Sequence, residues 1–443
     1  PPPPPPLSPP PPPPPPLSPS PRPPPTARRG ARTNRVQTLA PSPHVSTSPP
    51  SLSPLLPARM LALPFKQVDR PVDWASALDK YVRKAYSKRV ADGHTKEFAA
   101  VGETRRLALA SQPSTSNAEA MLGALGKYYR LLVALDRRFD LSQLRLTFVW
   151  RDAFKPSVKQ GEAEPLFERA AVLFNVAAVL SYEAITQKRS EIEGIKQACK
   201  YFQLVAGLLE QLRELVADAP WAGEANASGD LCVYTLDTMK TLMLAQAQRC
   251  FYEKAALDEL SPKLLSLVAS QAATYYKQAS QMLRSDRMAA KVDASWANVV
   301  DWNLALFEGL AQFHAAEQHA AAYEYGHQVA RLSIGVVKLK HAVALSSKAT
   351  PELRKVYEEA LAKVEWAHGL AVKDNSTVYL EPIPDAATLP AVPGTSIAKP
   401  LPYEDLEPTN GESGPPNTST SEDPFIHIVP GSSTHLRAHE SDS

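Results

Sequence analysis

Proline is crowded at the start of this chain, and its distribution decides where a fold can form. More than half of the 44 prolines precede Met60. Proline fixes the backbone and removes an amide donor, and residues 1–59 hold too few apolar side chains to offset the entropy of ordering a core. We therefore predict a disordered proline-rich segment over 1–59 and a folded part that begins at Met60.

The proline-rich segment allows two interpretations. Its PxxP repeats lie near Arg22, Arg28 and Arg29, a pattern that an SH3-type domain can bind. The other interpretation is that the stretch is incidental, because the chain does not begin with Met and Met60 is a candidate start.

From Met60 to Lys373 the apolar residues recur with the period of an α-helix. After Asp73, a good N-cap residue, Trp74, Leu78 and Val82 fall on one helical face. Further amphipathic stretches predict helices over 117–136, 165–187, 191–217, 235–257, 261–284, 294–324, 326–347 and 351–372. Helical hairpins in series, each too small to bury its own face, predict a solenoid-like stack.

One segment breaks the helical pattern. In residues 144–150 the large apolar side chains occupy every second position, which predicts a half-buried strand. A strand needs partners, and the best candidates are the short segments 61–68 and 380–383.

Charge and cysteine content exclude several classes of function. The net charge of +2 comes from 48 basic and 46 acidic residues, so no strong field favours nucleic acid or a membrane as the main partner. Cys199, Cys232 and Cys250 form no CxxC pair, and we expect buried thiols in a reducing compartment. The longest apolar runs fall short of the roughly 20 residues that cross a bilayer, so we expect no transmembrane segment.

Motifs for catalysis are missing from the sequence. There is no glycine-rich phosphate loop, no GxSxG motif and no dinucleotide fingerprint. His314 and His319, with Glu317 between them, come nearest to a zinc motif, but their five-residue spacing turns them about 140° apart on a helix. We expect no enzymatic activity, no cofactor and no metal.

Apolar side chains are in excess along the helix that follows Pro262. Leu264, Leu267 and Val268 lie on one stripe, while Leu265 points about 100° away. Such a helix has two faces to bury. Either both faces pack inside the stack, or one of them receives a helix from a partner.

Five segments, in order, resemble the Bro-one domain family, whose members include Alix and PalA. They are LTFVWRDAF (146–154), FERAAVLFNVAAVLS (167–181), EGIKQACKYFQLVAG (193–207), LMLAQAQRCFYEKA (242–255) and GHQVARL (326–332). VKDNSTVYLEPIP and IAKPLP look like the end of that domain. The resemblance implies a mainly α fold, a boomerang-shaped domain built on a tetratricopeptide-like helical solenoid with a small β-sheet.

The domain organisation follows from this resemblance. We expect the disordered segment 1–59, a Bro-one domain over 60–402, and a disordered tail over 403–443. Longer family members continue into a V-shaped helical domain, which has no counterpart after Leu401. The chain is therefore either a protein with only this domain or a truncated one.

The resemblance also implies a function. Family members act as endosomal sorting adaptors that bind the C-terminal amphipathic helix of charged multivesicular body proteins, subunits of the ESCRT-III filament. We therefore expect a cytoplasmic protein that is recruited to endosomes, supports multivesicular body sorting and can associate peripherally with the membrane. The alternative is a scaffold in ambient-pH (PalA-type) or Rho-linked signalling, which would use the same surface.

The partner site implied by the resemblance is a hydrophobic groove. Matching on LAQAQ places its apolar residues and its cationic neighbours at Phe251, Leu264, Val268, Lys254 and Lys196. Two positions depart from the family pattern. Ile192 stands where the family has an acidic residue near Lys196, and His327 replaces the acidic residue of the GEEIARL-like motif. The apolar centre therefore matches the family, whereas the polar rim does not.

Overall fold

The computed structural model describes residues 60–114, 116–223, 229–406, 425 and 428. The predicted proline-rich segment 1–59 lies outside the described residues, as does most of the predicted tail.

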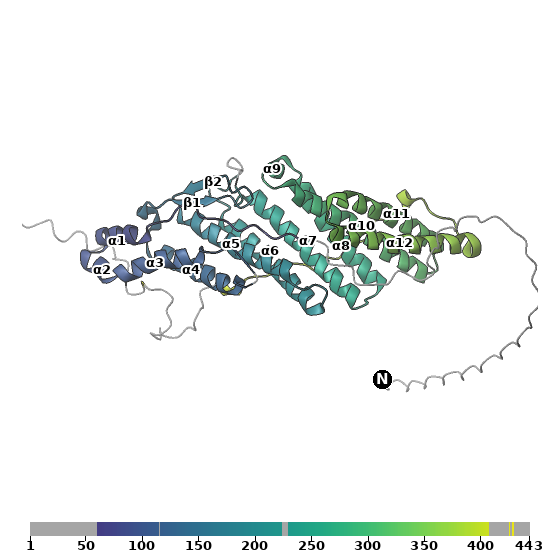
Figure 1. The fold of residues 1–443 in the computed structure, drawn as a ribbon, viewed down its shortest axis with the longest axis horizontal. Helices are drawn as coiled ribbons and strands as arrows, with labels where there is room; N and C mark the ends of the chain where they lie inside the picture. The colour runs from purple at the N-terminus through teal and green to yellow at the C-terminus, as the bar shows by residue number, and fades with distance from the viewer. Residues whose placement is uncertain (1–59, 115, 224–228, 407–424, 426–427, 429–443) are drawn as a thin grey trace, which may run out of the picture. The chain divides into compact units, whose positions relative to one another are not determined.

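The described part is mainly helical. Its helices are α1 (Trp74–Ala85), α2 (Lys88–Gly93), α3 (Thr95–Ala108), α4 (Ala118–Arg138), α5 (Pro165–Thr186), α6 (Ile192–Leu215), α7 (Val233–Leu257), α8 (Pro262–Leu283), α9 (Asp286–Ala289), α10 (Ala294–Ala321), α11 (Tyr325–Leu345) and α12 (Pro351–Asp374). From α4 onward each long helix packs against the long helix before it, so the helices follow one another from α1 to α12 (Figure 1). This arrangement confirms the predicted helical solenoid.

Local sequence determines where the helices begin. The carboxylate of Asp73 accepts a hydrogen bond from the backbone N–H of Ser76 at 3.0 Å, which caps α1. Ser261 caps α8 and precedes Pro262, whose fixed φ suits the first helical position. Asp293 caps α10 through the N–H of Ser295 at 2.8 Å.

The small sheet has two antiparallel strands, β1 (Phe148–Arg151) and β2 (Lys159–Glu162). The sequence predicted β1 but missed β2, because β2 is polar and too short to show an alternating pattern. Of the predicted partners, the segment 61–68 is confirmed only at its end, where Val68 forms an isolated bridge with Trp150. The prediction that residues 380–383 pair with β1 was wrong. The carboxylate of Glu381 instead accepts a hydrogen bond from the N–H of Gly326, on α11, at 2.8 Å.

Residues 60–68, the N-terminal strap, are held by buried side-chain amides. Asn175 on α5 accepts from the backbone N–H of Lys66 at 2.7 Å and donates to its carbonyl at 3.1 Å. Gln246 on α7 pairs with the N–H and carbonyl of Leu61 in the same way, at 2.6 and 2.9 Å. Each amide pairs with both backbone groups of one strap residue, so Leu61 and Lys66 have their hydrogen bonds without a strand partner.

Helix α5 supplies the apolar centre of the domain. It is long and apolar enough to cross a membrane. The prediction from sequence missed this property because it considered only uninterrupted apolar runs, and Asn175 interrupts the run in α5. However, 72% of its most apolar 18-residue window is buried within the protein. The apolar side chains of α5 therefore serve the core between α4 and α6.

The core extends beyond the predicted boundary at residue 402. Phe425 is fully buried between Phe98 on α3 and Phe139, with ring centroids 5.8 and 5.7 Å away. Arg138 donates to the carbonyl of Ile428 at 2.7 Å, and Ile428 is also buried. The prediction of a disordered tail over 403–443 was therefore wrong at these positions, because Phe425 packs its ring against Phe98 and Phe139.

Candidate functional site

Most of the residues predicted to form the groove meet at the turn between α7 and α8. Phe251 and Lys254 lie near the end of α7, and Leu264 lies in the first turn of α8. The turn is tight, since Glu259 has a left-handed backbone with φ of 51° and Ser261 caps α8 through the N–H of Leu264. The two helix ends, and their side chains, therefore lie next to each other.

The apolar residues differ in exposure. Phe251 and Leu264 are partly buried, so each packs on the core and also presents a surface. Val268 is only 1% exposed and belongs to the core cluster. Val268 can therefore form a floor beneath a bound partner, but it presents no surface of its own.

Both predicted cations already have acidic partners on their own helices or turns. Lys254 forms an ion pair with Asp258 in the α7–α8 turn. Lys196 on α6 is half exposed and lies 3.4 Å from the carboxylate of Glu193, which is itself exposed. An acidic group of a partner would have to compete with these pairs, and exposed ion pairs contribute little.

A buried ion cluster holds α7 against the start of α6. Glu253 accepts from Arg189 at 2.7 Å and from Arg249 at 2.7 Å, and all three side chains are nearly buried. Burial alone would raise the pKa of Glu253, but the two guanidinium groups outweigh it and hold this pKa below its ordinary value. Arg249 also donates to Asn303 on α10 at 2.7 Å, so the cluster ties α7 to α10 and to the loop between α5 and α6.

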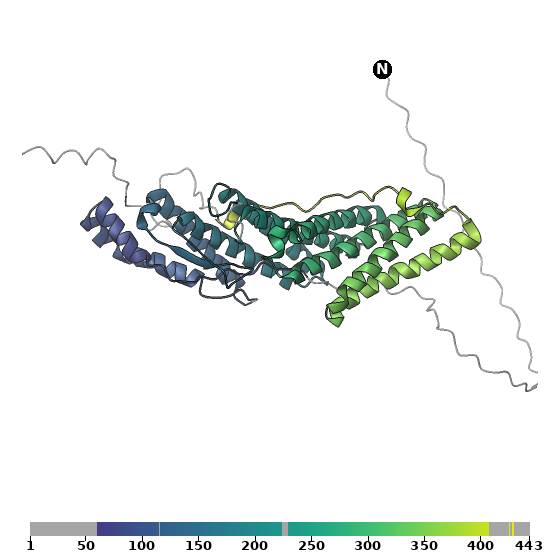
Figure 2. The same cartoon turned by 90° about the horizontal axis from the view of Figure 1, so that it is seen from above.

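Residues 390–401, which we call the C-terminal strap, run back across α8, α7 and α6 (Figure 2). On α8, Ser270 donates to the carbonyl of Val392 at 2.7 Å, and the N–H of Thr395 donates to the carbonyl of Leu267 at 3.1 Å. On α6, the N–H of Leu401 donates to the carbonyl of Gln203 at 3.0 Å.

On α7 the strap is held by the buried amide of Gln248. Its Oε1 atom accepts from the N–H groups of Ile397 and Ala398, both at 3.0 Å. Its Nε2 atom donates to the carbonyls of Thr395 at 3.0 Å and Val268 at 3.3 Å. Every hydrogen-bonding position of this amide is occupied, which fixes the strap relative to α7 and α8.

The strap borders the residues predicted to form the groove. Gln248 is three residues from Phe251 on α7, and Leu267 is three residues from Leu264 on α8, so each pair spans about one helical turn. Ile397 on the strap is 38% exposed. We call Phe251, Leu264 and Ile397 together the α7–α8 surface. The sequence predicted only the first two, because IAKPLP was interpreted as the end of the domain and not as part of a site.

The two positions that depart from the family pattern lie in different places. Ile192 is the first residue of α6 and is 42% exposed, so it adds apolar area near Lys196. His327 is on α11, where its ring stacks on His319 with centroids 5.3 Å apart. The change at His327 therefore affects the turn between α10 and α11.

Other residues singled out in the sequence have structural partners. His314 is buried and bonded to the hydroxyl of Tyr252 at 3.0 Å and to Glu317 at 2.7 Å. In the part of the chain that the structure describes, no group of three or more side chains could hold a metal. The three cysteines are free and buried, which confirms the prediction of thiols.

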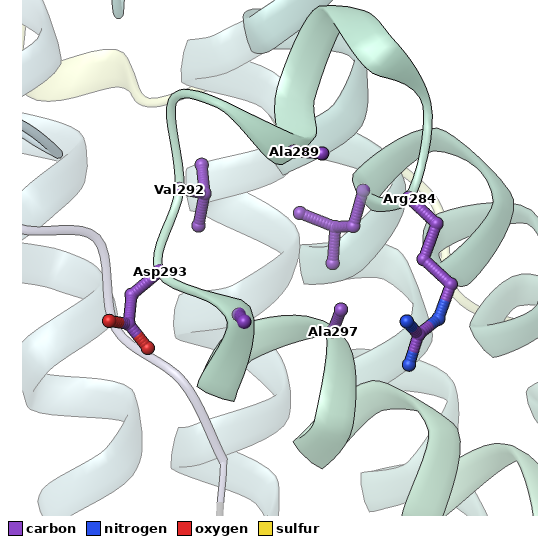
Figure 3. A pocket seen from close by; sticks show the side chains of 7 residues that line it. Arg284, Ala289, Val292, Asp293 and Ala297 are labelled. Atoms are coloured by element: carbon purple, nitrogen blue, oxygen red, sulfur yellow. The ribbon is translucent and has the colours of Figure 1, made fainter.

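A small pocket of about 130 Å³ lies at the far end of α8, beside α9 and the start of α10 (Figure 3). Its walls are mostly alanine, valine and leucine. Its two charged residues already have partners, since Arg284 forms an ion pair with Asp301 and Asp293 caps α10. The pocket has the size and lining of a packing gap.

Comparison with known proteins agrees with this geometry. The sequence profile of the BRO1-like domain matches residues 60–440. The chain belongs to the BRO1-like domain family. It is 32% identical over 386 residues to ALG-2 interacting protein X of Dictyostelium discoideum, and 32% identical over 371 residues to vacuolar protein-sorting protein bro-1 of Neurospora crassa. These matches cover 86% and 80% of this BRO1-like chain but only 46% and 35% of the relatives, so the chain spans less than half of their length.

Solved structures place this BRO1-like chain with ALIX. A crystal structure of ALIX bound to the SIVmac239 PYKEVTEDL late domain superposes with a TM-score of 0.72 at 25% identity, over 84% of this chain and 52% of that one. An ALIX BRO1 CHMP4C complex superposes with a TM-score of 0.68 at 25% identity, over 78% of this chain and 95% of that one. The predicted family and fold class are confirmed.

Proposed function

We propose that this BRO1-like chain binds the C-terminal amphipathic helix of an ESCRT-III charged multivesicular body protein on the α7–α8 surface. The observation that carries the proposal is that Phe251 and Leu264 each lie about one helical turn from a residue that hydrogen-bonds the C-terminal strap, which carries the exposed Ile397. An amphipathic helix presents apolar residues at i, i+3, i+4 and i+7, a spacing suited to such a surface. The ALIX BRO1 CHMP4C complex supports this choice of partner.

Apolar contacts supply most of the affinity in this proposal. Lys254 is paired with Asp258, and Lys196 lies beside Glu193, so neither cation is available without competition. A buried aromatic at the centre of an interface is a typical hot spot. The protein would act as a cytoplasmic adaptor, recruited to endosomes by this contact in support of multivesicular body sorting.

Binding of a synthetic C-terminal helix of a charged multivesicular body protein to the full chain tests the proposal. Phe251→Ala and Ile397→Asp should each weaken binding, the former by about 30-fold, which corresponds to about 2 kcal/mol. Leu107→Asp is the matched control, because Leu107 is 56% exposed on α3, away from α7 and α8. Equal affinity for all three variants and the unmodified chain would refute the proposal.

A further inference from the structure

Positive charge is concentrated in α1 and α2. Between Trp74 and Lys96 the sequence has six basic side chains and two acidic ones. Six of the 48 basic residues and none of the 46 acidic residues precede Met60, so from Met60 onward acidic residues outnumber basic ones by four. Residues 60–402 have 41 basic and 38 acidic side chains, so the net charge of +4 between Trp74 and Lys96 exceeds that of the whole domain.

Five of these six basic side chains are exposed, and they lie on α1, α2 and the first turn of α3. On α1 the buried residues Trp74, Leu78 and Val82 form one face, and Lys80 and Lys84 lie on the opposite face. The lysines are four residues apart, so they neighbour each other along this exposed side.

An ion pair between the helices keeps α2 beside this face. Arg83 on α1 contacts Asp79 on its own helix and Asp92 on α2, each at 2.7 Å. Lys88 is four residues before Asp92, so it lies on the side of α2 that faces Arg83. The two acidic side chains of the region are therefore both used by one arginine.

Five cations remain after that pairing. They are exposed, and none of them forms an ion pair with a residue in the described part of the chain: Lys80, Lys84, Lys88, Arg89 and Lys96. We call these five residues the basic face. The field of Lys80 reaches the capping carboxylate of Asp73, whose pKa is lowered mainly by its hydrogen bonds from Ser76.

We propose that the basic face binds the anionic lipid headgroups of a membrane surface. Four of its five residues are lysines, which act as point charges and suit mobile headgroups better than one fixed carboxylate. Arg83, whose planar fork could bind a protein carboxylate in two places, is already occupied by Asp79 and Asp92. The face is separate from the α7–α8 surface, because α1 and α2 lie at one end of the helical row (Figure 1).

Vesicle sedimentation with the full chain tests this proposal. Vesicles of phosphatidylcholine alone are compared with an equal mixture of phosphatidylcholine and phosphatidylserine, at low and high salt. Each cation near an anionic membrane changes partitioning about fivefold, so Lys80→Glu/Lys84→Glu/Lys88→Glu should reduce binding to the mixed vesicles by about 100-fold or more. Binding by the unmodified chain should decline as salt rises.

A matched control distinguishes an effect of the basic face from an effect of the protein's net charge. Lys277→Glu/Lys348→Glu/Lys373→Glu changes the charge equally at three exposed lysines elsewhere, and it should keep vesicle binding. The control also accounts for the six arginines within 1–59, which both variants retain. Lys80→Gln/Lys84→Gln/Lys88→Gln replaces the glutamate variant if the latter melts early.

Three results would overturn the proposal. The unmodified chain could fail to sediment with mixed vesicles at low salt, or the two triple variants could lose binding equally. The chain could also bind polyglutamate through the basic face while ignoring the vesicles, which would indicate an acidic protein partner.

Discussion

Gln248 and Ile397 connect α7 to the C-terminal strap, through a 3.0 Å hydrogen bond from the backbone N–H of Ile397 to the side-chain Oε1 atom of Gln248. Two residues earlier on the same helix, Gln246 holds Leu61 of the N-terminal strap. Residues i and i+2 point to opposite sides of a helix. The N-terminal strap and the C-terminal strap therefore contact opposite sides of α7, and only the C-terminal strap borders the α7–α8 surface.

This arrangement predicts different effects from two similar substitutions. Gln248→Leu and Gln246→Leu each leave buried backbone groups without partners, at about 1 to 3 kcal/mol per group, so both should lower stability. Only Gln248→Leu should also weaken binding of the partner helix, by about tenfold, because it releases Ile397. Calorimetric titration and thermal unfolding of both variants test this, and an equal loss of affinity would show that the strap has no special role.

Gly207 marks the place where the C-terminal strap touches α6. A Cβ atom there would lie 1.9 Å from the carbonyl oxygen of Leu401, so Gly207→Ala must displace the strap and should cost about 2 kcal/mol or more. Gly123 in α4 has nothing within 4 Å of such an atom. Gly123→Ala should therefore raise stability by up to about 1 kcal/mol through helix propensity alone. Denaturant unfolding of the two variants should give opposite signs.

The ion pair between Lys254 and Asp258 leads to a prediction about the polar rim. Asp258→Asn removes the competing carboxylate, so a partner helix with an acidic residue near Lys254 should bind about two- to threefold more tightly. The gain should vanish at high salt, because exposed charges are screened. Lys254→Ala serves as the comparison, and unchanged affinity in both variants would place Lys254 outside the interface.

The buried cluster around Glu253 makes part of the stability depend on pH. Because Arg189 and Arg249 depress the pKa of Glu253 in the folded state, its charge stabilises the fold above the unfolded value of about 4.5. That contribution is lost as the pH falls through the lower folded value. Glu253→Gln should cost about 3 kcal/mol at neutral pH, and the difference from the unmodified chain should shrink below pH 4.5. A constant difference at all pH values would contradict this cause.

The sequence was sufficient for features that repeat along the chain. Helical periodicity placed α5 to within one residue at each end. Its apolar side chains, Pro165 in the first turn and the polar residues that flank it all indicate the same bounds. The helices α2 and α3 were missed, since α2 has only six residues and α3 has little amphipathic contrast. Short elements are defined by their tertiary contacts and leave weak local patterns.

The site was predictable only in part, for a related reason. Phe251 and Leu264 belong to helices with a readable pattern, and their proximity follows from the tight turn between α7 and α8. Ile397 comes from an extended segment whose position depends on Gln203 and Gln248, about 150 to 200 residues earlier in the chain. Such long-range hydrogen bonds have no local signal, and the burial of Phe425 was missed for the same reason.

The central claim is tested most directly by Leu264→Asp, with stability and binding measured on one preparation. Leu264 is partly exposed in the first turn of α8, where an acidic side chain is favourable, so the free energy of unfolding should fall by about 1 kcal/mol or less. Affinity for the C-terminal helix of a charged multivesicular body protein should fall about 30-fold or more. Near-normal unfolding with lost binding is the result the account predicts, whereas near-normal unfolding with unchanged affinity would contradict it.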